Sequence, residues 1–301
     1  MSAKLQNQSW ITRRRFLGGT AAAAAGLAGW GSRAAGGNEA VDPLFSKIGI
    51  VSGPNHAEAL RESGIEFLQM GVESLLVPGE EEEVFEARRR ELDGLGLPVL
   101  GVNVFIRPDR LRCVGPEANH DEVMEWSKTV FRRAAACGVR IIVFGSAGAR
   151  RLPEGWGVGQ ADEQFTALLA RMGPAAAEHG VVVAVEQLRA AECNYINHID
   201  HAARLVRGAG HDHIRLLADL FHMMQAGDGP DTLLGVGDVL AHVEVAEKEG
   251  RTVPGVAGDD FRPYFEALRR IGYRGMICME GRWEVEQIAH AVATIREQAG
   301  M

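Results

Sequence analysis

Short apolar runs alternate with longer amphipathic segments along the chain from residue 47 onward. Most of these runs are nearly continuous, which is typical of parallel strands that are buried on both faces. We expect eight strands, over Lys47–Val51, Glu66–Met70, Pro98–Phe105, Val139–Phe144, Val181–Glu186, Ile214–Asp219, Val239–Val245 and Gly275–Glu280.

Between and after these runs, apolar residues recur at helical spacing. We expect helices over Ala57–Ser63, Glu82–Leu95, Asp121–Cys137, Asp162–His179, Ile196–Ala209, Asp259–Ile271 and Trp283–Gln298. The sixth connection, Gly229–Gly237, is short and rich in glycine, so the sequence gives the weakest indication of a helix there. Eight such alternations predict an α/β fold, a single (β/α)8 TIM barrel.

A doubly wound sheet is the rival fold, and it would need about six strands and a glycine-rich phosphate turn after the first. The sequence there is Val51-Ser52-Gly53-Pro54-Asn55, which contains no such turn.

The chain of 301 residues has 46% apolar and 24% charged residues, the balance of a globular protein. Its net charge of −8 argues against a nucleic-acid partner, which needs clustered positive charge. The four cysteines are scattered without Cys-x-x-Cys spacing, which disfavours a zinc ribbon or a thioredoxin-like site.

The first 35 residues have the pattern of a targeting segment. Three arginines, Arg13 to Arg15, precede a short run of small apolar residues and then Ser32-Arg33-Ala34-Ala35. This pattern resembles a twin-arginine export signal, so we expect a signal peptide over residues 1–35, a single barrel domain over residues 36–301 and a periplasmic or exported protein. Removal of the five positive charges in residues 1–35 would change the net charge from −8 to −13. The apolar run is too short to span a bilayer comfortably, so we expect no stable membrane insertion of the mature protein.

Carboxylates end four successive apolar runs in the second half of the chain: Glu186, Asp219, Glu244 and Glu280. The carboxyl ends of barrel strands meet at one mouth, where the active sites of such barrels lie. Four carboxylates that converge there would repel one another unless a cation lay between them. Hard divalent ions favour carboxylate oxygens, so we expect one divalent metal, with Mn²⁺ or Mg²⁺ first and Co²⁺ or Zn²⁺ as alternatives.

Several motifs resemble those of the ketose 3-epimerase and hydroxypyruvate isomerase group, within the xylose-isomerase-like TIM-barrel superfamily. They are the stretch Glu186–Asn197, the D-x-x-H of Asp219–His222, the stretch His242–Glu244 with Arg251 after it, and the closing Glu280. The resemblance implies metal ligands at Glu186, Asp219, Glu244 and Glu280. The epimerases have histidine and the hydroxypyruvate isomerases glutamine at the place of Glu244. His242 would be the ligand instead if the register of its strand were shifted.

The resemblance also implies a reaction, in which a proton moves through an enediolate of a small sugar. Glu186 and Glu280 would then be the catalytic acid/base pair, and Glu192, His222 and Arg251 would bind the substrate. We therefore expect a metal-dependent sugar isomerase or epimerase, with a homo-oligomer left open. One alternative is an exported lyase, dehydratase or epimerase that acts on 3-keto sugars or glycosides, and another is a sugar-binding barrel without catalysis. The endonuclease branch of the superfamily is disfavoured, because it needs more histidine ligands and a basic groove for DNA.

Overall fold

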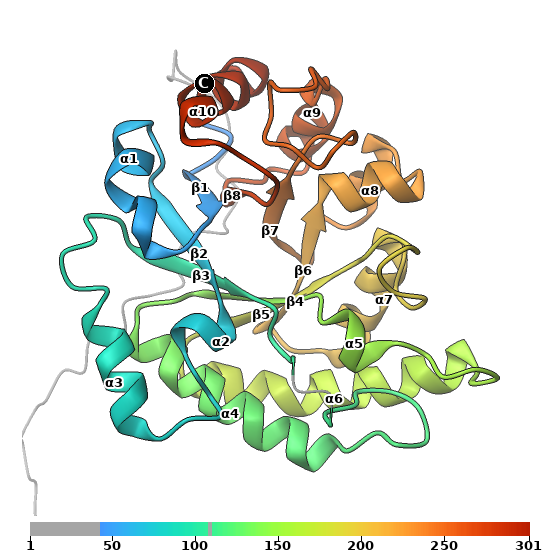
Figure 1. Cartoon of the computed structure of the whole chain (residues 1–301). Helices are drawn as coiled ribbons and strands as arrows, with labels where there is room; N and C mark the ends of the chain where they lie inside the picture. Colours follow the sequence, from blue (N-terminus) through green and yellow to red (C-terminus); the bar gives the residue numbers. More distant parts are fainter. Residues whose placement is uncertain (1–42, 108–109) are drawn as a thin grey trace, which may run out of the picture. The chain divides into compact units, whose positions relative to one another are not determined.

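Eight parallel strands form a closed barrel in the computed structural model, which describes residues 43–107 and 110–301. Each strand pairs with the next one in the sequence, and β8 pairs with β1. Figure 1 shows the strands at the centre and the helices around them. The strands are β1 Lys47–Val51, β2 Phe67–Gly71, β3 Val99–Asn103, β4 Ile141–Phe144, β5 Val182–Glu186, β6 Ile214–Asp219, β7 Leu240–Val245 and β8 Met276–Met279. The predicted (β/α)8 barrel is confirmed.

The longer helices cover the outside of the barrel with one apolar face each. In α7, for example, Ile199, Ala202, Leu205 and Val206 are buried, and Gly210 ends the helix in the left-handed conformation. Seven helices correspond to predicted ones: α1 Ala57–Glu62, α3 Glu82–Arg90, α4 His120–Ala136, α6 Val158–Glu178, α7 Ile199–Ala209, α9 Arg262–Arg270 and α10 Val285–Ala299. Their ends differ from the predicted ends by a few residues.

Three short helices were not predicted, and all three follow the carboxyl end of a strand. They are α2 Val72–Leu75, α5 Ala147–Arg150 and α8 Leu220–Ala226. Segments of four to seven residues are too short to show helical periodicity. The sixth crossover was expected over Gly229–Gly237, but its helical part begins earlier. Helix α8 starts directly after Asp219, and a 3₁₀ helix, η2 Pro230–Gly235, follows it. Helix α8 places His222 at the mouth of the barrel.

The segment expected to be an export signal lies outside the described residues. Within the part of the chain that the structure describes, no helix is both long and apolar enough to cross a membrane.

Candidate metal centre

The four carboxylates expected to bind metal lie together at one end of the barrel. Glu186 and Asp219 are the last residues of β5 and β6, and Glu280 follows β8 directly. Glu244 lies in β7, in register with Asp219 of the neighbouring strand. One oxygen atom of each of the four carboxylates lies within 4.8 Å of one from each of the others. The end-of-strand positions thus place all four side chains around one point.

His242 shares the inward face of β7 with Glu244, two residues further along the strand. Its side chain is fully buried, and its Nε2 lies 3.9 Å from Glu244 Oε1. It belongs to neither group of residues that could hold a metal ion within the described chain. The structure therefore places Glu244 in the cluster, and His242 outside it.

Burial and mutual repulsion disfavour the ionised forms of these carboxyls. Burial raises the pKa of Asp219 to about 6 and the pKa of Glu280 to about 7. Burial also raises the pKa values of Glu186 and Glu244 well above the ordinary range, and the charges of Glu280 and Asp219 add to the effect. Without a cation, the cluster therefore holds protons that isolated carboxylates would release at neutral pH.

The hydrogen bonds of the cluster leave oxygen atoms free for a cation. Asp219 Oδ1 accepts the backbone N–H of Phe221 at 2.8 Å, and Glu244 Oε1 accepts Gln69 Nε2 at 2.7 Å. The other oxygen of each carboxylate is buried without a hydrogen-bond partner, as is Oε1 of Glu186. Buried, unpartnered oxygens are costly unless something binds them. The donor set fits a hard divalent ion, which carboxylate oxygens prefer to bind.

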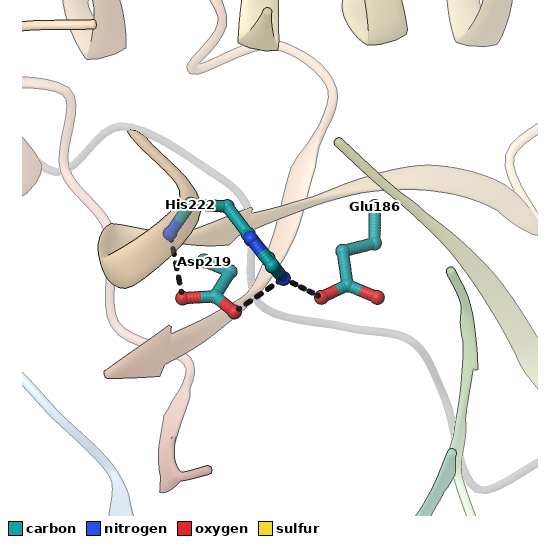
Figure 2. A group of neighbouring side chains, drawn as sticks. All are labelled: Glu186, Asp219 and His222. Carbon is teal, nitrogen blue, oxygen red and sulfur yellow. Dashed lines mark hydrogen bonds and ion pairs between the residues drawn. The ribbon is translucent and has the colours of Figure 1, made fainter. Parts of the chain in front are cut away.

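His222 lies beside two of these carboxylates, as Figure 2 shows. Its Nε2 is 3.4 Å from Asp219 Oδ2 and 3.6 Å from Glu186 Oε1. Its Nδ1 faces the backbone N–H of Arg189 at 3.2 Å, so Nδ1 is the acceptor and Nε2 carries the proton. Burial, together with the charge of Arg251, lowers the pKa of His222 to about 3, so the ring is neutral. Glu186, Asp219 and His222 are the second group that could hold a metal.

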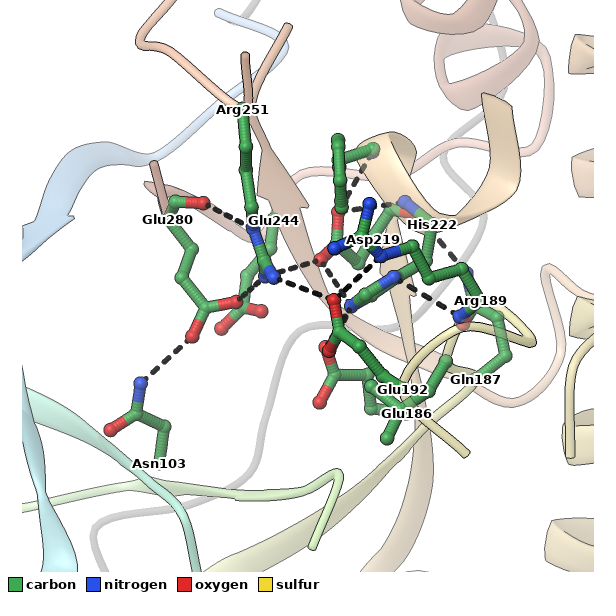
Figure 3. A network of polar contacts seen from close by, with 12 residues as sticks. Asn103, Glu186, Gln187, Arg189, Glu192, Asp219, His222, Glu244, Arg251 and Glu280 are labelled. Atoms are coloured by element: carbon green, nitrogen blue, oxygen red, sulfur yellow. Dashed lines mark hydrogen bonds and ion pairs between the residues drawn. The ribbon is translucent and has the colours of Figure 1, made fainter. Parts of the chain in front are cut away.

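Arg251 extends its guanidinium across the cluster, between Glu280 on one side and Asp219 and Glu192 on the other (Figure 3). Its Nη2 lies 2.5 Å from Glu280 Oε2 and 3.5 Å from Asp219 Oδ2, and its Nη1 lies 3.3 Å from Glu192 Oε1. The guanidinium also lies over the ring of Phe221, 4.6 Å from the centroid. Both Arg251 and Glu192 are partly exposed, so they lie where a substrate could reach them. All seven residues expected at the site are thus brought together.

Two amide side chains from the first half of the barrel complete the site, and neither was predicted. Gln69 of β2 donates to Glu244, and Asn103 of β3 donates from Nδ2 to Glu280 Oε1 at 2.8 Å. Both are polar residues in otherwise apolar strands, and Asn103 is the last residue of its strand. The sequence predicts a strand over Pro98–Phe105, so Asn103 did not stand out as the residue that ends this strand; the observed β3 ends at Asn103.

Gly145, at the carboxyl end of β4, leaves the space that Glu186 occupies. A Cβ atom at Gly145 would lie 2.2 Å from Glu186 Oε2, so an alanine there would displace the carboxylate. We expect Gly145→Ala to weaken Mn²⁺ binding by about 10–100-fold, as disturbance of ligand positioning commonly does. Isothermal titration calorimetry measures the change. Gly148→Ala is the control, because a Cβ there meets nothing within 4 Å; equal Mn²⁺ affinity in the two variants would contradict the expectation.

The loop that carries Arg251 is arranged around the buried side chain of Glu247. The Glu247 carboxylate accepts Thr252 Oγ1 at 2.8 Å and the backbone N–H groups of Gly255 at 2.9 Å and Gly258 at 2.8 Å, as well as those of Ala257 and Asp259. Arg251 itself has a positive φ of 50°, and its carbonyl oxygen accepts the backbone N–H of Arg282 at 2.7 Å. Glu247 therefore holds the backbone on which Arg251 is mounted.

We expect Glu247→Ala to lower the free energy of unfolding by about 3 kcal/mol or more, since one hydrogen bond to a charged group contributes about 1.5–3 kcal/mol and several are lost. Urea unfolding followed by circular dichroism measures this change. Limited proteolysis should also cut the 252–259 loop sooner. Glu249→Ala removes an exposed carboxylate from the same loop and serves as the control. A stability change as small as that of the control would show that Glu247 does not hold the loop.

Comparison with known proteins identifies the family. The model of the xylose isomerase-like TIM barrel family matches residues 57–298. The chain belongs to this family, as the sequence motifs predicted.

Two relatives match shorter stretches of the chain. The chain is 33% identical over 117 residues to 3-dehydro-D-guloside 4-epimerase from Escherichia coli (strain K12), covering 38% of this chain and 44% of that protein. It is 31% identical over 113 residues to D-psicose 3-epimerase from Enterocloster bolteae, covering 37% of each protein. Each match spans less than half of the length of the relative.

Solved structures share the fold over most of the chain. D-Psicose 3-epimerase with D-tagatose from Clostridium cellulolyticum H10 has a TM-score of 0.72 at 17% identity and covers 85% of this chain and 96% of its own. The IOLI protein with a binding zinc atom has a TM-score of 0.65 at 16% identity, with coverages of 84% and 98%. At these identities the likeness establishes the barrel fold, and the function has to be argued from the site.

Proposed function

We propose that this protein is a metal-dependent sugar isomerase or epimerase that moves a proton through an enediolate. The observation that carries the proposal is the convergence of Glu186, Asp219, Glu244 and Glu280 at the mouth of the barrel. The first three each have a buried oxygen without a hydrogen-bond partner. The family contains enzymes named as sugar epimerases, and a structural neighbour is described with zinc. Mn²⁺ or Mg²⁺ suits the oxygen donors of this chain best, with Co²⁺ and Zn²⁺ as alternatives.

A divalent cation bound there would polarise the carbonyl group of a substrate and make the adjacent C–H more acidic. Glu186 and Glu280 come from strands on different sides of the cluster, so they can face a substrate from two directions. One carboxylate removes the proton, and the other, protonated, returns one. Glu280 also contacts Asn103 and Arg251, which hold its carboxylate at the mouth of the barrel. Return of the proton to the same carbon gives an epimer, and return to the neighbouring carbon gives an isomer.

The remaining polar groups of the mouth would hold the sugar. The neutral His222 presents its Nε2–H toward the cluster, where it can donate to a hydroxyl or carbonyl oxygen. Arg251 and Glu192 supply a donor and an acceptor at the partly exposed edge of the site. The guanidinium of Arg251 also reduces the repulsion among the carboxylates that it contacts. Its positive charge offsets part of their negative charge, and this suits a substrate without charge, such as a polyol.

A second candidate is an exported lyase, dehydratase or epimerase that acts on 3-keto sugars or glycosides. Its support is the 33% identity over 117 residues to an enzyme named 3-dehydro-D-guloside 4-epimerase. A carbonyl group at C3 acidifies the neighbouring C–H in the same way, so the same carboxylates would serve. The twin-arginine signal proposed for residues 1–35 fits this candidate, because phosphorylated sugars are confined to the cytoplasm.

Solvent exchange tests the proposal and separates the candidates. The metal-loaded protein is incubated in D₂O with free ketoses, hydroxypyruvate and 3-keto glucosides, and NMR follows the deuterium that enters each compound. We expect metal-dependent deuterium at the carbon next to a carbonyl group, and the labelled compound and position distinguish the isomerase, the epimerase and the lyase. A protein that binds the metal but exchanges no compound of the set would contradict catalysis and favour the sugar-binding alternative.

A further inference from the structure

Gln69 and Glu244 form a buried pair across the interior of the barrel. Gln69 lies within β2, and its Nε2 donates to Glu244 Oε1 of β7 at 2.7 Å, although the two residues are 175 positions apart. Neither side chain is exposed at all. Burial of a polar group is costly unless it is hydrogen-bonded. This contact satisfies Nε2 of Gln69, whose Oε1 is buried without a partner, and it orients the two side chains toward each other.

The contact decides how Glu244 can serve a cation. Because Gln69 occupies Oε1, the free oxygen of Glu244 is Oε2, which is buried without a hydrogen-bond partner. Glu244 can therefore offer one oxygen, in a fixed orientation, to the point where Glu186, Asp219 and Glu280 also offer oxygens. Two imidazoles lie near these oxygens. His242 belongs to neither candidate metal group, and the Nε2 of His222 carries a proton.

We propose that Gln69 and Glu244 together determine which metal this protein takes, by making its site an all-oxygen set of four carboxylates. The inference rests on the proposed function, since it requires the cluster to bind a metal. Oxygen donors suit hard ions such as Mn²⁺ and Mg²⁺, whereas an imidazole nitrogen favours Zn²⁺. A carboxylate at position 244 shifts the preference from Zn²⁺ toward Mn²⁺, and Gln69 is the positioning residue that holds this carboxylate as a ligand.

Affinities for Mn²⁺ and Zn²⁺ alone test the specificity, and they need no substrate. The metal-stripped full chain is titrated with each ion by competition calorimetry. We expect Glu244→His to raise the ratio of Zn²⁺ to Mn²⁺ affinity by about tenfold or more, because it adds a nitrogen donor. Glu244→Gln keeps an oxygen, so it should weaken both ions and leave the ratio close to that of the wild type; it also provides the comparison if the histidine variant fails to fold.

The positioning role of Gln69 has its own variant. Gln69→Met removes the amide and keeps a side chain of similar length, and we expect it to weaken Mn²⁺ binding by about 10–100-fold. Gln164→Met is the matched control, because Gln164 is hydrogen-bonded to the backbone of Gly115 and contacts none of the four carboxylates. Unchanged Mn²⁺ affinity in Gln69→Met would overturn the positioning role.

Pulsed electron paramagnetic resonance of bound Mn²⁺ reports directly on the ligands. We expect no ¹⁴N modulation from a coordinated imidazole in the wild type, and clear ¹⁴N modulation in Glu244→His. Modulation in the wild type would mean that an imidazole, of His222 or His242, is a ligand, which overturns the all-oxygen set. Tight metal binding with the same Zn²⁺ to Mn²⁺ ratio in the wild type and Glu244→His overturns only this inference, whereas a wild type that binds neither ion overturns the proposed function with it.

Discussion

Replacing Glu280 with glutamine is expected to reduce metal-dependent deuterium exchange by about 10²–10⁴-fold, the usual contribution of a general acid or base. Glutamine has nearly the same size and can still meet the Nδ2 of Asn103 with its carbonyl oxygen. It cannot take up a proton, and it removes the negative charge that faces Arg251 at 2.5 Å. NMR in D₂O with the best compound of the set measures the rate.

The metal must be saturating in this comparison, because Glu280 is also an expected ligand. Calorimetry with Mn²⁺ sets the concentration for each variant separately. Glu286→Gln makes the same chemical change at an exposed position of α10 and serves as the control. If Glu280→Gln, saturated with metal, exchanges within tenfold of the control, Glu280 is not part of the acid/base pair.

Without the metal, the free energy of unfolding is expected to fall as the pH rises from about 4 to 7. Folding raises the pKa of Asp219 from 3.8 to about 6 and that of Glu280 from 4.5 to about 7. Between those values the folded state holds more protons than the unfolded state, so the free energy of unfolding falls as the pH rises. One pKa unit corresponds to about 1.4 kcal/mol, so the decrease amounts to several kcal/mol.

Metal binding should reverse this trend, since a cation binds the deprotonated carboxylates and stabilises only the folded state. At 1,000 times its dissociation constant a ligand contributes about 4 kcal/mol. Urea unfolding at several pH values, with a chelator and with saturating Mn²⁺, measures both effects. Glu244→Gln removes one buried carboxyl and should make the metal-free decrease smaller. A metal-free stability that is constant or rises between pH 4 and 7 would show that the four carboxyls are not crowded as described.

The barrel and most of the site could be predicted because both depend on patterns that the chain repeats. Buried parallel strands are nearly continuous apolar runs, so a carboxylate that ends such a run, as Glu186 ends β5, is easily recognised. The amides of Gln69 and Asn103 were not predicted, because the expected site was defined by carboxylates that end the last four strands, although Gln69 visibly interrupts the apolar run of β2. Contacts across the barrel, such as Gln69 with Glu244, join residues far apart in the chain and leave no local signal.

The short helices and the loop around Glu247 could not be predicted from the sequence, for a different reason. Helix α5 has four residues, too few to show a period. Glu247 lies just after β7 in a polar, glycine-rich stretch, where an acidic residue ordinarily faces water. Its burial follows from the way residues 252–259 fold back over it, which no pattern in the sequence indicates. Arg251, by contrast, was identified through the resemblance of its motif.

The most direct test of the metal centre is anomalous diffraction from crystals grown with Mn²⁺. We expect one strong peak at the mouth of the barrel, with an oxygen of each of Glu186, Asp219, Glu244 and Glu280 at about 2.0–2.6 Å, the range for carboxylates bound to hard divalent ions. A peak elsewhere, or none at saturating Mn²⁺ with the four carboxylates still converging, would contradict the claim that these residues form a metal site.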